Sequence, residues 1–199
     1  MRQHGLETRI RRAYRVTTRP NPRLPVAPNQ LERQFTATRP NEKWLADFTY
    51  IRTQQGWLYL ATVLDVFSRQ IVGWSMSHRP QTALVENALR MALARRCPSA
   101  GLLHHSDRGS QYTSGHYQKL LAQHHIKVSM SRTGQPYDNA MAESFFATLK
   151  TECVTYRFAT RVEARATVFD YIEVWYNRQR LHSSLGYLSP AAFERLHAA

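Results

Sequence analysis

Three consecutive stretches rich in β-branched and aromatic residues begin abruptly at Trp44, and they constrain the fold more than any other feature of the chain. Only short polar turns, Gln54-Gln55-Gly56 and Ser68-Arg69, separate them. Residues of these types favour extended backbone, and turns this short join neighbouring antiparallel strands. The pattern therefore predicts three consecutive antiparallel strands, over residues 44–52, 57–67 and 70–78.

Helical and extended patterns alternate after these strands. Apolar residues recur at helical spacing from Thr82 to Arg96, between Pro80 and Pro98. A strand, a helix and a fifth strand are predicted next, over residues 102–106, 114–125 and 126–131. The order βββαβαβ predicts an α/β fold with a mixed five-stranded sheet, three antiparallel strands and then a βαβ unit, flanked by helices. Beyond a loop at 132–137, helices are predicted from Asn139 to about Val154 with Asp138 as the cap, over 162–177, and from Pro190.

The charge balance indicates a polyanionic partner. The chain has 27 Lys and Arg against 14 Asp and Glu, a net charge of +13, and 23 of the cations are arginines. Arginine binds phosphate oxygens bidentately, so nucleic acid is the expected partner. Residues 1–43, with ten Lys and Arg and five of the nine prolines, are predicted to form a basic, proline-rich arm, with at most a short helix near residues 5–14. The arm either contacts DNA or is a solvated linker, and residues 44–199 are expected to form the folded core with a C-terminal helical tail.

Cysteine usage and hydropathy restrict the class of protein further. Cys97 and Cys153 lie far apart and form no CxxC pattern, which excludes a zinc ribbon or a disulfide framework. No apolar run reaches the roughly 18 residues of a membrane-spanning helix, and the N-terminus lacks an apolar signal core. We therefore expect a protein of a reducing cytoplasm that stays with the chromosomal DNA, at the nucleoid of a bacterial cell, and has no membrane partner.

Three acidic residues stand where metal ligands are expected. Asp47 interrupts a strand of apolar and aromatic residues, where a lone buried carboxylate is costly. Asp107 ends an apolar strand, and ligand sites concentrate at this position in α/β sheets. Glu143 lies in the first turns of a helix, and Lys150 lies two turns further on the same face of that helix. Carboxylates that hold a pair of magnesium ions suit phosphodiester transfer. The structural alternatives are an arginine partner for Asp47, a turn at Asp107 and a surface position for Glu143.

Five ordered motifs resemble the integrase-core transposases of the insertion-sequence-three family. They are WLADFTY (44–50), LDVFSR (64–69), HSDRGSQYTS (105–114), GQPYDNAMAESFFATLK (134–150) and YNRQRLHSSLGYLSP (176–190). The resemblance implies a ribonuclease-H-like fold shared with retroviral integrases. It also implies that Asp47, Asp107 and Glu143 are the catalytic, metal-binding triad and that Lys150 contacts DNA.

The function implied is metal-dependent cleavage and strand transfer of the DNA of an insertion element. The expected cofactor is Mg²⁺, for which Mn²⁺ substitutes, and the expected assembly is a homo-oligomer bridging DNA ends. Family members carry a helix-turn-helix region ahead of the core, often supplied through an upstream reading frame, and the 43 residues here are too few for it. The chain is then either a fragment or one partner of a frameshifted pair, the other partner carrying the helix-turn-helix region. Two other functions stay open: a ribonuclease-H-like nuclease, and a truncated or decayed transposase that only binds DNA or a partner transposase.

Several further residues are candidates for DNA contact. Asn139 belongs to the active-site neighbourhood by resemblance or simply caps a helix. Tyr137 and Arg132 could stack or clamp on DNA from the loop before it. By the family pattern, DNA or the edge of the core is contacted by four tail residues, Asn177, Arg178, Arg180 and His182; the alternative is that their charge complements a helix C-terminus.

Three more polar residues invite a structural or a metal-binding interpretation. Asp65 is expected to pair with Arg69 rather than to support Asp47. His104 and His105 should point to opposite faces of their strand, which argues against a zinc site between them.

Overall fold

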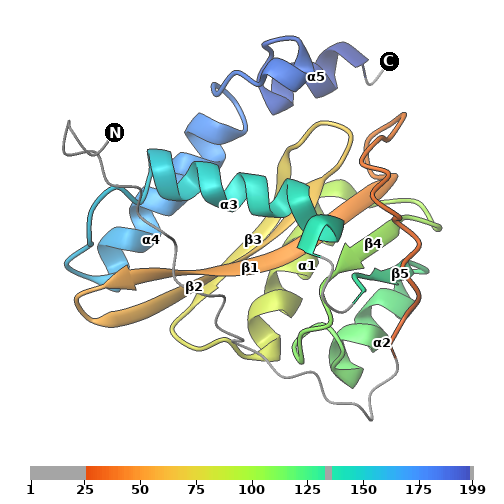
Figure 1. Ribbon diagram of the computed structural model, residues 1–199, viewed down its shortest axis with the longest axis horizontal. Helices are drawn as coiled ribbons and strands as arrows, with labels where there is room; N and C mark the ends of the chain where they lie inside the picture. The colour runs from red at the N-terminus through yellow and green to blue at the C-terminus, as the bar shows by residue number, and fades with distance from the viewer. Residues whose placement is uncertain (1–25, 133–135, 198–199) are drawn as a thin grey trace, which may run out of the picture.

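The computed structural model describes residues 26–132 and 136–197, and a five-stranded sheet in the order β3-β2-β1-β4-β5 forms its centre (Figure 1). β1, β2 and β3 are antiparallel, whereas β4 pairs in parallel with both β1 and β5. The strands are β1 (Lys43–Thr53), β2 (Gly56–Asp65), β3 (Ile71–Ser77), β4 (Leu103–Ser106) and β5 (Lys127–Met130). The predicted mixed sheet is confirmed, with β1 as its central strand.

Helices cover both faces of the sheet (Figure 1). α1 (Thr82–Arg96) and α2 (Gly115–Gln123) pack on one face, together with Trp44 and Ala46 of β1. α3 (Ala140–Glu152) and α4 (Arg161–Asp170) pack on the other face, together with Leu45 and Ile51. This division follows from the alternation of side chains along a strand, and it makes the two faces of β1 belong to two separate hydrophobic clusters.

The amphipathic spacing of α3 decides which of its residues are available for chemistry. Ala142, Phe145, Phe146 and Leu149 are buried at intervals of three, one and three residues, which places them on one stripe of the helix. Burial of such a stripe holds α3 on the sheet. The side chains between these positions, among them that of Glu143, stay outside the packed stripe.

The C-terminal half departs from the predicted helices in two places. The helix predicted over 162–177 is α-helical only over α4, where Thr160 and Glu163 form a capping box, and it continues as a π-helical turn over Tyr171–Tyr176. The helix predicted from Asn139 begins at Ala140, after a 3-10 turn over Pro136–Asn139. α5 (Pro190–His197) ends the described chain. No helix in the described ranges is both long and apolar enough to span a bilayer.

The segment before β1 has neither a helix nor a strand in its described part, residues 26–42. Leu31 is nevertheless buried in the hydrophobic cluster that contains α3, and Phe35 and Ala37 pack against that cluster. Residues 31–37 thus cover the α3 side of the core. The short helix predicted near residues 5–14 lies outside the described residues.

Candidate active site

Asp47 lies near the middle of β1, on the face of the sheet that α3 covers. It is an odd-numbered strand position, as are Leu45 and Ile51, whose side chains pack in the cluster with α3. Alternation along the strand therefore directs the Asp47 carboxylate to the same face. Asp47 is half-buried, and its Oδ1 accepts a hydrogen bond of 2.8 Å from the backbone N–H of Phe48.

Asp107 lies beside Asp47 because of the parallel register of β1 and β4. Trp44 pairs with His104. Asp47 comes three residues after Trp44, and Asp107 comes three residues after His104, so the two aspartates lie at the same level along the sheet. Asp107 comes just after the end of β4, and its Oδ1 accepts the N–H of Gly109 at 2.8 Å. A Cβ at position 109 would lie 2.9 Å from this same oxygen, so the glycine leaves room for the carboxylate.

Glu143 and Lys150 come from α3. Glu143 is exposed in the first turn, and Lys150 is exposed in the last turn of the helix. The Lys150 Nζ lies 5.3 Å from the centre of the Tyr50 ring, a cation–π contact that ties the end of α3 to β1. The C-terminal end of α3 therefore lies close to the strand that carries Asp47.

The charges of Asp107 and Glu143 both act on Asp47. Burial and, to a smaller extent, these two charges raise the pKa of Asp47 to about 8, against the Phe48 N–H and Lys150, which lower it. Burial also raises the pKa values of Asp107 and Glu143. Clustered carboxylates disfavour one another's ionised forms and suit a hard divalent cation. Within the described residues, however, no three Asp, Glu, His or Cys side chains are arranged as a group that could hold a metal ion.

Tyr112 is a polar neighbour of the acids that sequence reasoning missed. Its side chain is buried, and its hydroxyl has no hydrogen-bond partner in the described part of the chain. Burial raises the pKa of Tyr112 well above its usual value, and the charges of Asp47 and Asp107 add to this effect. The hydroxyl is therefore a neutral donor within electrostatic range of both aspartates. A tyrosine five residues after Asp107 carries no sequence signal that distinguishes it from a core residue.

The turn before α3 holds Asn139, for which helix capping was one of the two interpretations. Asn139 occupies the N-cap position, yet its side chain makes no capping hydrogen bond. It is buried, and its Oδ1 has no partner among the described residues. Asn139 precedes Glu143 by about one helical turn. The capping interpretation is wrong, and the amide is available beside the glutamate.

Asp138 does not cap α3 as predicted, because its carboxylate is engaged elsewhere. Oδ2 accepts hydrogen bonds from the Asn29 side chain at 2.9 Å and from the Arg132 backbone N–H at 3.2 Å, and Oδ1 lies 3.3 Å from Arg33 Nε. Its side chain is only 4% exposed. The buried carboxylate thus joins the segment before β1 to both ends of the loop that leads into α3. Sequence reasoning missed this role because the partners are far away in the chain.

His105 belongs to the same junction. The Ser129 hydroxyl accepts the backbone N–H groups of Gln30 and Leu31 and lies 2.8 Å from His105 Nδ1, while His105 Nε2 lies 3.0 Å from the Ser131 hydroxyl. Burial lowers the pKa of His105 to about 4, so the ring is neutral near pH 7. Residues 29–33 are therefore fixed to β5 as well as to Asp138.

His104 lies on the other face of β4, where its Nε2 lies 2.9 Å from the Tyr117 hydroxyl. The two histidines therefore point to opposite faces, as predicted. Asp65 is fully buried and contacts Arg96 at 3.6 Å, so the expected pairing with Arg69 is wrong.

Of the remaining candidates for DNA contact, Arg178 lies away from the acids. Arg178 is exposed and lines a small hollow with Arg95 and Arg96, next to the start of β3. β1 is separated from β3 by β2, so Arg178 lies at a distance from Asp47 across the sheet. Arg132 is exposed in the loop, and the side chain of Tyr137 lies outside what the structure describes.

Comparison with known protein families gives two matches to integrase core domain models, over residues 37–136 and 124–190. The transposase InsF for insertion sequence IS3A of Escherichia coli is 48% identical over 200 residues, which cover all of this chain and 69% of that protein. A 31 kDa protein of insertion element IS600 from Shigella sonnei is 51% identical, covering 96% of this chain and 71% of that protein. The transposase for insertion sequence element IS904 of Lactococcus lactis is 52% identical, covering 86% and 68%.

Solved structures confirm the predicted ribonuclease-H-like fold. The HTLV-2 integrase catalytic core domain, solved in complex with magnesium, superposes with a TM-score of 0.63 at 16% identity and covers 80% of this chain and 99% of that one. A chain of the simian T-cell lymphotropic virus intasome gives a TM-score of 0.67 at 17% identity and covers 90% of this chain and 61% of that one. The chain is 48% and 52% identical to two named transposases over most of its length, and it has the integrase fold. It therefore belongs to the integrase-core transposases of the insertion-sequence-three family.

Proposed function

We propose that this transposase cleaves DNA at the ends of an insertion element and joins the freed strand to target DNA, with Asp47, Asp107 and Glu143 as the residues that hold its divalent metal. One observation carries the proposal. Burial of Asp47 on β1, together with the charges of Asp107 after β4 and of Glu143 on α3, raises the pKa of Asp47. Repulsion between these carboxylates is unfavourable in the metal-free protein, and a bound cation would relieve it. This is the behaviour expected of a cation-binding site.

The chemistry of the donors supports Mg²⁺, with Mn²⁺ as a substitute. Carboxylate oxygens are the ligands that hard divalent cations prefer. A cation held there would neutralise charge on the phosphate under attack and on the leaving oxygen. Since no three-residue group in the described chain is arranged to hold a metal, we propose that the exposed Glu143 closes on the two aspartates when a cation binds.

The reaction proposed consists of two displacements at phosphorus. In cleavage, the oxygen of a water molecule bonds to the phosphorus at the element end, and the bond between phosphorus and the 3′ oxygen breaks. The 3′ hydroxyl so freed then bonds to a phosphorus of the target DNA and displaces a 3′ oxygen there. Neither step requires a covalent bond to the protein. In this proposal the neutral Tyr112 hydroxyl and the Asn139 amide, whose buried oxygens have no partner among the described residues, would orient the acids and the strand.

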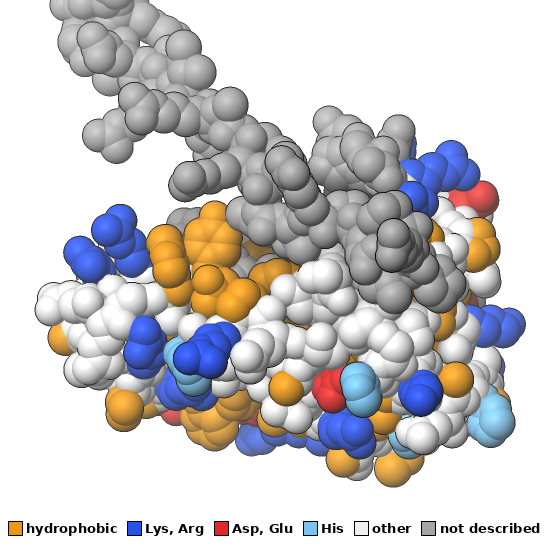
Figure 2. All heavy atoms as spheres, turned by 90° about the horizontal axis from the view of Figure 1, so that it is seen from below, with side chains coloured by type: hydrophobic (Ala, Val, Ile, Leu, Met, Phe, Trp, Pro, Cys, Tyr) orange, Lys and Arg blue, Asp and Glu red, His pale blue; other side chains and the backbone are white. Residues whose placement is uncertain are grey.

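Charge supports DNA as the substrate. Lys and Arg side chains are spread over the face seen in Figure 2, and acidic side chains are few on it. Lys150, with Arg132 and Tyr137 from the loop before α3, would grip the strand near the acids, and Arg178 would contact DNA at a distance from them. We further propose a homo-oligomer on DNA, a partner with a helix-turn-helix region, and action at the bacterial nucleoid.

The decisive experiment is a cleavage and joining assay with magnesium on DNA that carries the element end. Asp47→Asn, Asp107→Asn and Glu143→Gln each remove a charge without changing shape. Each is expected to reduce cleavage on the order of a thousandfold. Asp170→Asn, at an exposed position in the last turn of α4, is the control and should retain full activity.

The outcome also separates the two other functions. Cleavage without any joined product would identify a nuclease of the same fold. Tight, salt-dependent binding without product from the unmodified chain, with either metal, would identify a transposase that only binds DNA. Full activity of a triad variant would remove that residue from the proposed site.

A further inference from the structure

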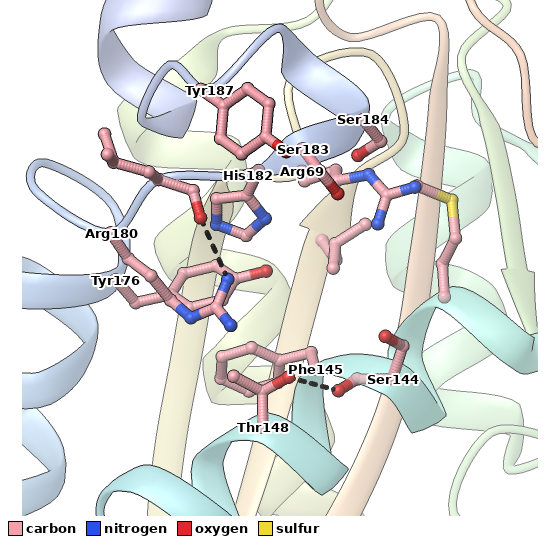
Figure 3. Close-up of a pocket in the computed structure, with 13 residues that line it drawn as sticks. Arg69, Ser144, Phe145, Thr148, Tyr176, Arg180, His182, Ser183, Ser184 and Tyr187 are labelled. Carbon is pink, nitrogen blue, oxygen red and sulfur yellow. Dashed lines mark hydrogen bonds between the residues drawn. The ribbon is translucent and has the colours of Figure 1, made fainter.

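A second concave site lies on the other side of α3 from the acids. It is a pocket of about 300 Å³ between α3, the turn that joins β2 to β3, and the segment after the π-helical turn (Figure 3). Ser144 and Thr148 line it from α3, Arg69 from the turn, and Arg180 and His182 from the later segment. Because Ser144 directly follows Glu143, the pocket and the candidate active site share one helix.

The pocket has a positive lining. Arg69 and Arg180 both contribute to it, and none of its lining residues is an aspartate or a glutamate. Arg180 forms an ion pair of 2.8 Å with Glu152, outside the lining. For Arg69, no ion pair with a carboxylate occurs within the part of the chain that the structure describes. A guanidinium with unused donors in a concave site is a binding group for anions.

His182 gives an independent indication of a ligand. The residue is 7% exposed, and its Nε2 is buried with no hydrogen-bond partner among the described residues. Burial lowers the pKa of His182 to about 4, and the charges of Arg180 and Arg69 contribute to the shift. The ring is therefore neutral, and one of its nitrogens lacks the partner that buried polar atoms normally have.

The hydroxyl groups around the pocket complete a polar lining. Ser183 and Ser184 approach it from the segment that carries His182, and Tyr187 stands at its edge (Figure 3). Serine hydroxyls and arginine are common partners of phosphate oxygens in protein–DNA contacts. A tetrahedral anion with several acceptor oxygens matches this set of donors better than a planar or apolar ligand.

We propose that this pocket binds a backbone phosphate of the DNA strand. This phosphate is the neighbour, along the same strand, of the phosphate that lies at the acids. The inference rests on the proposed function, because the strand reaches the pocket by crossing α3 from Glu143 to Ser144 and Thr148. These positions span little more than one helical turn, about 7 Å along the axis. The pocket thus anchors the strand and sets its position relative to Asp47 and Asp107.

The test measures binding without catalysis. A labelled duplex from the element end is titrated with the full chain in the presence of a chelator, over a series of salt concentrations. Arg69→Gln is expected to weaken binding about tenfold and to reduce the salt slope by about one, the change that loss of one phosphate contact produces. Arg90→Gln removes the same charge from an exposed position on α1, on the opposite face of the sheet, and should leave affinity and slope near those of the parent.

A second pair of variants keeps the test independent of the turn that holds Arg69. Ser184→Asp places a carboxylate at an exposed position of the pocket, where it competes with a phosphate, and Ser99→Asp adds the same charge in the exposed loop after α1. Ser184→Asp should weaken binding well beyond Ser99→Asp. Equal effects within each pair of variants would overturn the proposal.

The two proposals fail separately. If Asp47→Asn abolishes cleavage while Arg69→Gln and Ser184→Asp bind like their controls, the active site stands and the phosphate pocket is wrong. If the pocket variants lose binding in the chelator while Asp47→Asn still cleaves, the pocket stands and the proposed triad is wrong.

Discussion

Replacing Asp47 by asparagine should stabilise the protein in the absence of metal while it removes activity. The folded carboxyl group keeps its proton until about pH 8, whereas the group has an ordinary pKa of 3.8. Between these values folding takes up a proton, so the contribution of Asp47 to stability falls as the pH rises through this window. Above it, the folded protein carries the full cost of a charged carboxylate among other acids.

The size of the effect follows from the pKa shift and the exposure of the side chain. One pKa unit corresponds to about 1.36 kcal/mol, and four units would give about 5 kcal/mol. Because Asp47 is only half-buried, solvent screening reduces this, and we expect about 2 kcal/mol at pH 8.5. Asparagine can still accept the Phe48 N–H, so the local geometry is preserved. In a chain of this length the gain corresponds to a rise in Tm of about 4–8 °C.

Urea unfolding with a chelator, at pH 5 and at pH 8.5, measures the difference. Asp47→Asn should exceed the parent by only about 0.6 kcal/mol at pH 5, close to the ordinary pKa, and by about 2 kcal/mol at pH 8.5. The exposed Asp170→Asn should change neither value by more than about 0.5 kcal/mol. A variant of Asp47 that is equally or less stable than the parent at pH 8.5 would refute the idea that the acids repel one another in the folded protein.

Two further predictions concern the supports of the site. Asp138→Ala should lower the free energy of unfolding by about 3 kcal/mol, because buried donors lose a charged acceptor, and chemical denaturation should show almost no change for the exposed Asp170→Ala. Gly109→Ala should reduce cleavage more than tenfold, with a stability change below about 1 kcal/mol, because the new Cβ displaces only the end of the Asp107 side chain. Gly115→Ala, where a Cβ meets no atom within 4 Å, is its control in both the cleavage assay and thermal unfolding, and a matching loss of activity there would contradict the argument.

Local patterns in the sequence determined the order of the elements and drew attention to the three candidate acids. Strand alternation and helical spacing involve residues a few positions apart, so the five strands and the helices up to α3 could be predicted. An acid inside an apolar strand, as at Asp47, is also visible locally, since a buried charge needs a functional or paired partner wherever the chain places it.

Only the tertiary structure decided which distant groups meet. Asn29 and Asp138 are 109 positions apart, and neither residue type predicts the other as its partner. The predicted cap at Asp138 was wrong for this reason. Its carboxylate could have accepted N–H groups at the start of α3, but in the fold it accepts hydrogen bonds from donors that are distant in the sequence. The pocket formed by Arg69, Ser144 and Arg180 has the same origin, because hydrogen bonding and charge act through space, and sequence patterns report only neighbours along the chain.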